Sequence, residues 1–121
     1  MSALGVQWVL DFHGCPFDAL DRAETVRGAL LAAAARAGAT VLAESFHQFD
    51  PHGASGVVLI AESHLAIHTW PERGFAAADL FTCGDALDVE GAVSALEERL
   101  RPGRIERRRV ERGPARVPSP A

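Results

Sequence analysis

Residues 61–72, AESHLAIHTWPE, concentrate side chains that can do chemistry on what the pattern predicts to be a hairpin and a half-buried strand. At the Glu62–Ser63 step, a serine hydroxyl can attack the carbonyl of the peptide bond before it, which converts an amide into an ester. That reaction needs a strained or polarised carbonyl and nearby proton carriers, for which His68 and Ser55 are the candidates. An ordinary turn serine is the alternative interpretation.

The two histidines of this segment, His64 and His68, have the i, i+4 spacing of a helical metal pair. The β-branched residues around them and Pro71 indicate a strand instead, on which both histidines and Trp70 share one side. Neither a cysteine nor a carboxylate completes a ligand set, so we expect no metal. A buried histidine with a hydrogen-bond partner and a catalytic base remain equal interpretations of His68.

The other candidate residues lie at or just after the ends of predicted strands. Cys83, just before Gly84, can serve as a proton donor or as a small apolar filler. Phe49 and Trp70 can sandwich a flat ligand or pack in the core. Glu72 can bind ligand hydroxyls or remain a solvated charge.

The elements that must position these residues follow from the hydrophobic periodicity. Strands are predicted over residues 6–12, 40–49, 57–61, 65–70, 75–83 and 104–111, with helices from Asp18 to Ala37 and from Asp88 to Leu100. Short connections favour antiparallel pairing, and two helices can cover only one face of a sheet. We therefore predict an α+β two-layer sandwich of about six strands. Its helix-free face carries aromatic residues, and we expect a second copy of the chain to cover that face.

Composition bounds the class of protein. The chain has 121 residues, 48% hydrophobic and 23% charged, which predicts one domain over residues 1–113 and a disordered tail over residues 114–121. A net charge of −4 gives no reason to expect nucleic acid or an acidic membrane as partner. With no signal peptide or membrane helix visible, we expect a cytoplasmic protein in which Cys15 and Cys83 are free thiols.

Residues 54–84, ASGVVLIAESHLAIHTWPERGFAAADLFTCG, closely resemble the prokaryotic S-adenosylmethionine decarboxylase proenzymes. SFHQFDPHGASG, residues 45–56, is similar to the loop that precedes this segment in the family. The resemblance implies a self-cleaving, pyruvoyl-dependent decarboxylase that converts S-adenosylmethionine to its decarboxylated form for spermidine synthesis. It also implies a homo-oligomer, expected to be a dimer, of cleaved protomers.

The resemblance also implies roles for individual residues. Cleavage between Glu62 and Ser63 would leave a β chain of residues 1–62 and an α chain of residues 63–121. Ser63 would become the covalent pyruvoyl group (the pyruvate cofactor), whose carbonyl forms a Schiff base with the substrate amine. The remaining assignments are cleavage assistance by Ser55 and His68, proton donation by Cys83, and nucleoside binding by Phe49, Trp70 and Glu72.

The first strand departs from the family pattern. In GVQWVLDFHGC, residues 5–15, Val6 and Gln7 stand where the family commonly has a basic residue and a histidine. Asp11 stands where the family has a glutamate, and His13 where it has an aromatic residue. Asp11 and His13 are therefore possible specificity residues. A pyruvoyl-dependent ornithine or arginine decarboxylase is the alternative function. An uncleaved, non-catalytic nucleoside-binding or regulatory homologue is a second alternative.

Overall fold

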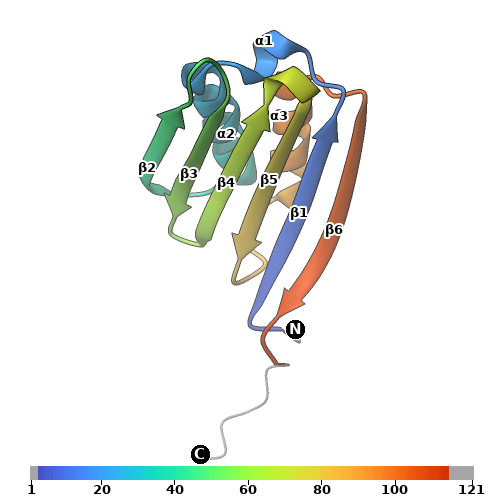
Figure 1. Cartoon of the computed structure of the whole chain (residues 1–121). Coiled ribbons are helices and arrows are strands. Elements are labelled where there is room, and N and C mark those ends of the chain that lie inside the picture. The colour runs from blue at the N-terminus through green and yellow to red at the C-terminus, as the bar shows by residue number, and fades with distance from the viewer. Residues whose placement is uncertain (1–2, 115–121) are drawn as a thin grey trace, which may run out of the picture.

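One antiparallel sheet of six strands organises the chain, and its helices lie on one side of it (Figure 1). The computed structural model describes residues 3–114, so most of the predicted tail lies outside the described residues. The strand order is β2-β3-β4-β5-β1-β6. The strands are β1 Gly5–His13, β2 Val41–Gln48, β3 Ala54–Ile60, β4 Ser63–Trp70, β5 Phe75–Thr82 and β6 Arg104–Arg112. The predicted α+β sandwich is confirmed.

Three α-helices and one 3-10 turn connect these strands within the described residues: α1 Phe17–Leu20, α2 Ala23–Ala37, η1 Pro71–Arg73 and α3 Val89–Leu100. The prediction for α3 is confirmed, because the Asp88 carboxylate accepts a hydrogen bond from the Gly91 N–H at 3.0 Å and caps the helix. The predicted end of α2 is also confirmed, since Gly38 follows it with a φ of 78°.

The prediction of one helix from Asp18 to Ala37 is wrong, because the helix is interrupted between α1 and α2. The carbonyl of Leu20 accepts a hydrogen bond from the Thr69 hydroxyl, and that of Asp21 accepts one from the Gly53 N–H. These carbonyls bond to other elements, so the helical ladder stops and restarts. Asp18 makes no capping bond and instead accepts from Arg101 at 3.1 Å.

The core lies between the sheet and the helices and follows the strand alternation. In β4, Leu65 and Ile67 are buried against the helices, while His64, His68 and Trp70 point to the opposite side. The alternation predicted for this strand is therefore confirmed. It puts the chemically active side chains and the packing side chains on different faces.

The opposite side of the sheet, called the open face below, is covered by no helix of the described residues (Figure 1). It carries Val57, Leu59 and Trp70, whose exposed fractions are 39%, 49% and 41%. Exposed apolar side chains gathered on one face are typical of a surface that meets a partner. No helix of the described residues is long and apolar enough to cross a membrane.

Candidate active site

The turn between β3 and β4 holds the Glu62–Ser63 peptide bond at one end of these two interior strands. Ser63 begins β4, and its φ of 155° lies at the limit of the positive range that L-residues rarely adopt. The Glu62 carbonyl accepts a hydrogen bond from the Cys83 N–H at 3.4 Å. The side chain of Glu62 accepts from the Thr40 N–H at 3.3 Å, which ties the turn to the start of β2. The peptide bond is therefore held in place, and its carbonyl is polarised by a backbone donor.

The Ser63 hydroxyl has one imidazole within reach. Its Oγ lies 3.4 Å from Nδ1 of the adjacent His64. Cys83 follows β5 directly and is exposed, and the β5 residue before it, Thr82, is the cross-strand partner of Ser63. The hairpin end of the sheet thus brings Ser63, His64 and the Cys83 backbone together.

Ser55 and His68 form a second cluster, away from the hairpin turn. They are cross-strand partners on β3 and β4, with Ser55 Oγ 2.7 Å from His68 Nδ1. His68 is five residues beyond Ser63 on the same strand, which is about 16 Å at about 3.3 Å per residue. Within one chain, the structure therefore does not bring the Ser55–His68 pair to the serine that it was predicted to assist.

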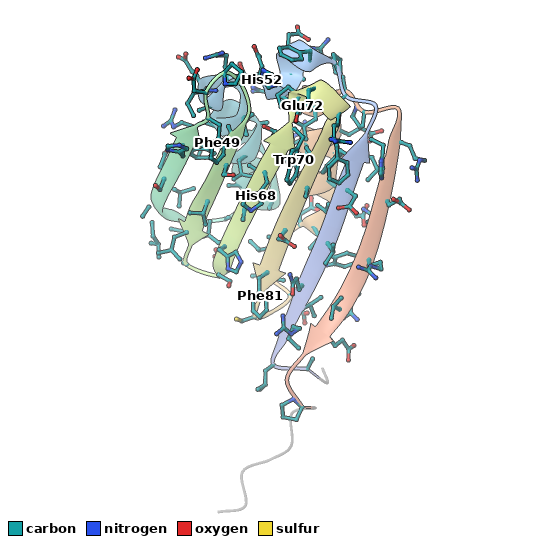
Figure 2. The ribbon with its side chains drawn as sticks, viewed as in Figure 1. Phe49, His52, His68, Trp70, Glu72 and Phe81 are labelled. Carbon is teal, nitrogen blue, oxygen red and sulfur yellow. The ribbon has the colours of Figure 1, made fainter. Side chains whose placement is uncertain are left out.

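Phe49, Trp70 and Glu72 do come together, around a hollow of about 360 Å³ at the end of β4 (Figure 2). Its lining also includes Pro51, His52, Ser55, His68 and Thr69. The aromatic rings of Phe49 and Trp70 line the hollow and are accessible, since 45% of Phe49 and 41% of Trp70 is exposed. Aromatic walls with one carboxylate suit a flat ligand that carries hydroxyl groups.

The sequence did not predict His52 as part of this hollow. Its Nε2 lies 3.2 Å from Glu72 Oε1, and its ring packs edge-on against Phe17 at 5.1 Å between centroids. The contact joins the loop after β2 to η1 across the mouth of the hollow. A turn-rich loop carries no periodic signal that could have pointed to it.

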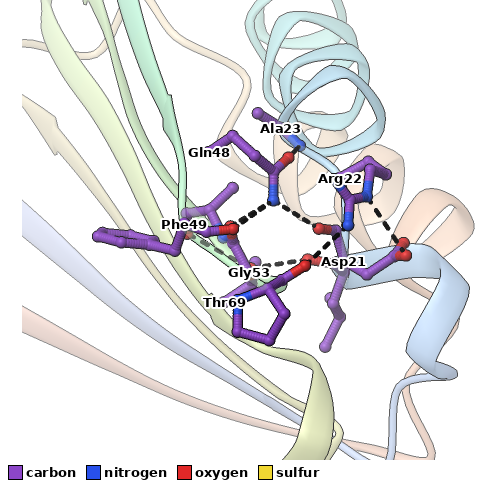
Figure 3. Close-up of polar contacts among 10 residues, drawn as sticks. Asp21, Arg22, Ala23, Gln48, Phe49, Gly53 and Thr69 are labelled. Atoms are coloured by element: carbon purple, nitrogen blue, oxygen red, sulfur yellow. Dashed lines mark hydrogen bonds and ion pairs between the residues drawn. The ribbon is translucent and has the colours of Figure 1, made fainter.

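The loop of residues 49–53 is anchored from behind by Gln48 (Figure 3). Gln48 Oε1 accepts from the Ala23 N–H at 2.6 Å, which satisfies a free donor at the start of α2. Its Nε2 lies within 3.0 Å of three carbonyl oxygens, those of Asp21, Phe49 and Gly53. The backbone of Phe49 is thereby held while its ring remains exposed.

Asp11 and His13 are on β1 and point to the open face. Strand β5 separates them from β4 and the hollow. His13 packs against Phe75 at 5.1 Å, and Phe75 against Trp70 at 5.6 Å, so His13 extends the aromatic row. A hydrogen bond from His13 at 2.7 Å lowers the pKa of Glu106, with Arg104 adding to the shift.

The position of Asp11 follows from the strand register. Asp11 and His68 are both cross-strand partners of Ala77, so Asp11 shares a row with His68. It also lines a separate hollow of about 410 Å³ beside β6. Both predicted specificity residues therefore border the open face but not the hollow that contains Phe49.

The two thiols differ. Cys15 is buried, and burial raises the pKa of its thiol to about 11, which keeps it protonated near neutral pH. Cys83 is exposed at the hairpin end. Among residues 3–114, no group of three histidine, cysteine or carboxylate side chains could hold a metal ion.

Comparison with known proteins identifies a family. The family model described as S-adenosylmethionine decarboxylase matches residues 6–113. The S-adenosylmethionine decarboxylase proenzyme of Acidithiobacillus ferrooxidans is 47% identical over 113 residues, covering 93% of this chain and 85% of the relative. The proenzyme of Thermosipho melanesiensis is 48% identical over 105 residues, covering 87% of this chain and 81% of the relative. The crystal structure of the adenosylmethionine decarboxylase from Aquifex aeolicus superposes with a TM-score of 0.88 at 40% identity, covering 100% of this chain and 98% of that one.

Proposed function

The chain belongs to the S-adenosylmethionine decarboxylase family, and we propose that it is a carboxy-lyase that releases carbon dioxide from S-adenosylmethionine. The proenzymes of this family depend on a pyruvoyl group. The observation that carries the proposal is the Glu62–Ser63 peptide bond at a half-buried hairpin turn, where the Glu62 carbonyl accepts a hydrogen bond from the Cys83 N–H. The decarboxylated product serves spermidine synthesis.

The pyruvoyl group is made from the chain itself. Cleavage between Glu62 and Ser63 leaves a β chain of residues 1–62 and an α chain of residues 63–121. The position of Ser63 fits this, since the cut falls in a turn and both strands stay paired in the sheet. When formed, the pyruvoyl group supplies an electron sink for the pair left as carbon dioxide departs.

The remaining residues bind substrate and move protons. Phe49 and Trp70 flank the adenine ring, and Glu72 accepts hydrogen bonds from the ribose hydroxyls. Cys83 returns a proton to the α-carbon after carbon dioxide leaves, a role that its exposed thiol at the hairpin end supports.

The active enzyme is a homodimer whose open faces meet. About 16 Å of β4 separates Ser63 from His68 in one chain, so a complete site needs the Ser55–His68 pair of a second copy. In a two-fold dimer each chain uses its own open face as the interface. If the β4 strands of the two chains run in opposite directions, Ser63 of one chain lies near the Ser55–His68 pair of the other. The exposed Val57 and Leu59 are then buried at the interface.

Denaturing mass analysis of the purified protein tests the self-cleavage. We expect two fragments, residues 1–62 and 63–121, from the wild-type chain and one intact 12.9 kDa chain from Ser63→Ala. A wild-type chain that stays intact after prolonged incubation would overturn the proposal and favour a non-catalytic homologue.

Carbon dioxide release tests the substrate. The cleaved protein is given S-adenosylmethionine, ornithine and arginine in separate reactions, and we expect release from S-adenosylmethionine alone. Release from ornithine or arginine instead would contradict the substrate and direct attention to Asp11 and His13, the altered residues of β1.

A further inference from the structure

Self-cleavage, on which this inference rests, requires two different protons to leave Ser63. Forming the ester removes the proton on Oγ, and the later elimination removes the proton on Cα. One proton is on the side chain and the other is on the backbone, and they leave in separate steps. The two transfers can therefore use different bases.

His64 is the imidazole beside the first of these protons. Its Nδ1 lies 3.4 Å from Ser63 Oγ, a separation that can shorten in the reacting state. His64 stacks on its cross-strand partner Phe81, with centroids 5.8 Å apart and ring planes 8° from parallel. The stack restricts rotation of the imidazole and keeps it beside the hydroxyl.

His68 is differently engaged. Its Nδ1 is 2.7 Å from the Ser55 hydroxyl, and it lies about 16 Å from Ser63 along β4. Reaching Ser63 would require a second chain, whereas His64 makes its contact within one chain. Nothing in the resemblance gives His64 a role.

We propose that His64 is a catalytic residue for the first step of self-cleavage. Its neutral ring, with the proton on Nε2, accepts the Ser63 hydroxyl proton at Nδ1 while Oγ bonds to the Glu62 carbonyl carbon. The Cys83 N–H stabilises the charge that develops on the carbonyl oxygen. The C–N bond then breaks, Nδ1 gives the proton to the departing nitrogen of Ser63, and the products are an ester and a free amine.

The second step belongs to another base. Removal of the Ser63 Cα proton breaks the Cβ–Oγ bond and releases Glu62 as a carboxylate. The enamine left behind takes a proton on Cβ and becomes an imine. Water then adds to the imine carbon, and ammonia leaves to give the ketone. The Ser55–His68 pair of a partner chain is free for this elimination, so the two histidines act at different stages.

The rate of chain cleavage tests the role of His64 without measuring decarboxylation. His64→Phe keeps a ring to stack on Phe81 and removes Nδ1, and we expect cleavage to slow by about a hundredfold or more. His64→Ala should be slow and partly restored by imidazole in the buffer. The matched control, His47→Phe, changes another open-face histidine that has its own ring neighbour, Phe49, and should cleave at the wild-type rate.

Hydroxylamine separates the two stages, because it cuts esters much faster than amides. An uncut His64→Phe chain should resist hydroxylamine, since it stops as the amide. A His68→Ala chain should be cut between residues 62 and 63, since it stops as the ester. Thermal unfolding of each variant checks that the fold is retained.

The outcomes are distinct. Wild-type cleavage rates in both His64→Phe and His64→Ala would overturn the role of His64 and leave the proposed function intact. Accumulation of a hydroxylamine-sensitive ester in His64→Phe would also overturn it, because the first step would then have occurred. A wild-type chain that never cleaves would overturn the proposed function itself.

Discussion

Mixing two inactive chains should restore activity if Ser63 of one protomer works with His68 of the other. Ser63→Ala removes the pyruvoyl precursor, and His68→Ala removes the imidazole that lies about 16 Å away on β4. A hydrogen bond spans about 3 Å, so no rotamer change within one chain closes that distance. Each variant alone should therefore fail, for a different reason.

The fraction of activity that is restored follows from the two-fold symmetry of the dimer. Random pairing of equal amounts gives heterodimers in about half of all dimers. Each heterodimer holds one complete site, formed by Ser63 of the His68→Ala chain and His68 of the Ser63→Ala chain, and one site that lacks both. Carbon dioxide release should reach about a quarter of the wild-type value per chain. About half of the His68→Ala chains should be cleaved.

The assay co-expresses the two variants with different affinity tags and measures chain mass and carbon dioxide release, first on the unfractionated mixture. In the purified doubly tagged dimer, release should rise to about half of the wild-type value per chain, and all His68→Ala chains should be cleaved. Singly tagged homodimers of each variant are the controls. A doubly tagged dimer that is inactive and uncut would refute the shared site. A His68→Ala homodimer that cleaves and turns over normally would refute it as well, since His68 would then not be needed.

Other consequences concern the loop, the buried thiol and one surface ion pair. Gln48→Met should raise the KM for S-adenosylmethionine more than it lowers kcat, because the loop behind Phe49 loses its hydrogen bonds, and it should have no further effect on binding in a Phe49→Ala chain. Burial raises the pKa of Cys15 from 9.0 to about 11, so its contribution to stability is full below pH 9 and falls as the pH rises towards 11. The unfolding temperature of Cys15→Ala should therefore fall less between pH 9 and pH 11 than that of the wild-type chain. Hydrogen bonds from Arg27 lower the pKa of Glu44, so this pair stabilises the fold above the ordinary glutamate pKa and the effect is lost as the pH falls below it. The unfolding temperature of Glu44→Gln should thus lie below wild type at pH 7 and meet it at about pH 3; a constant difference would contradict the assignment.

Much of the fold follows from local patterns. The alternation in β4 predicts which side chains are buried, and Asp88 and Gly38 mark helix ends through contacts within a few residues. The helix predicted from Asp18 fails because its continuity depends on distant groups. Hydrogen bonds from Thr69 and Gly53 take up the carbonyls at its break, and no local pattern encodes these bonds.

The sequence by itself determined the family and predicted the reactive step: a serine after a turn glutamate, with histidines, aromatic rings and a cysteine nearby, is local information. Only the tertiary structure decided which of these residues meet. Strand pairing sets Ser55 beside His68, and the rise of about 3.3 Å per residue carries that pair away from Ser63 while His64 stays next to it. Closeness in sequence along an extended strand is not closeness in space, and that is why we propose a site shared with a second copy of the chain.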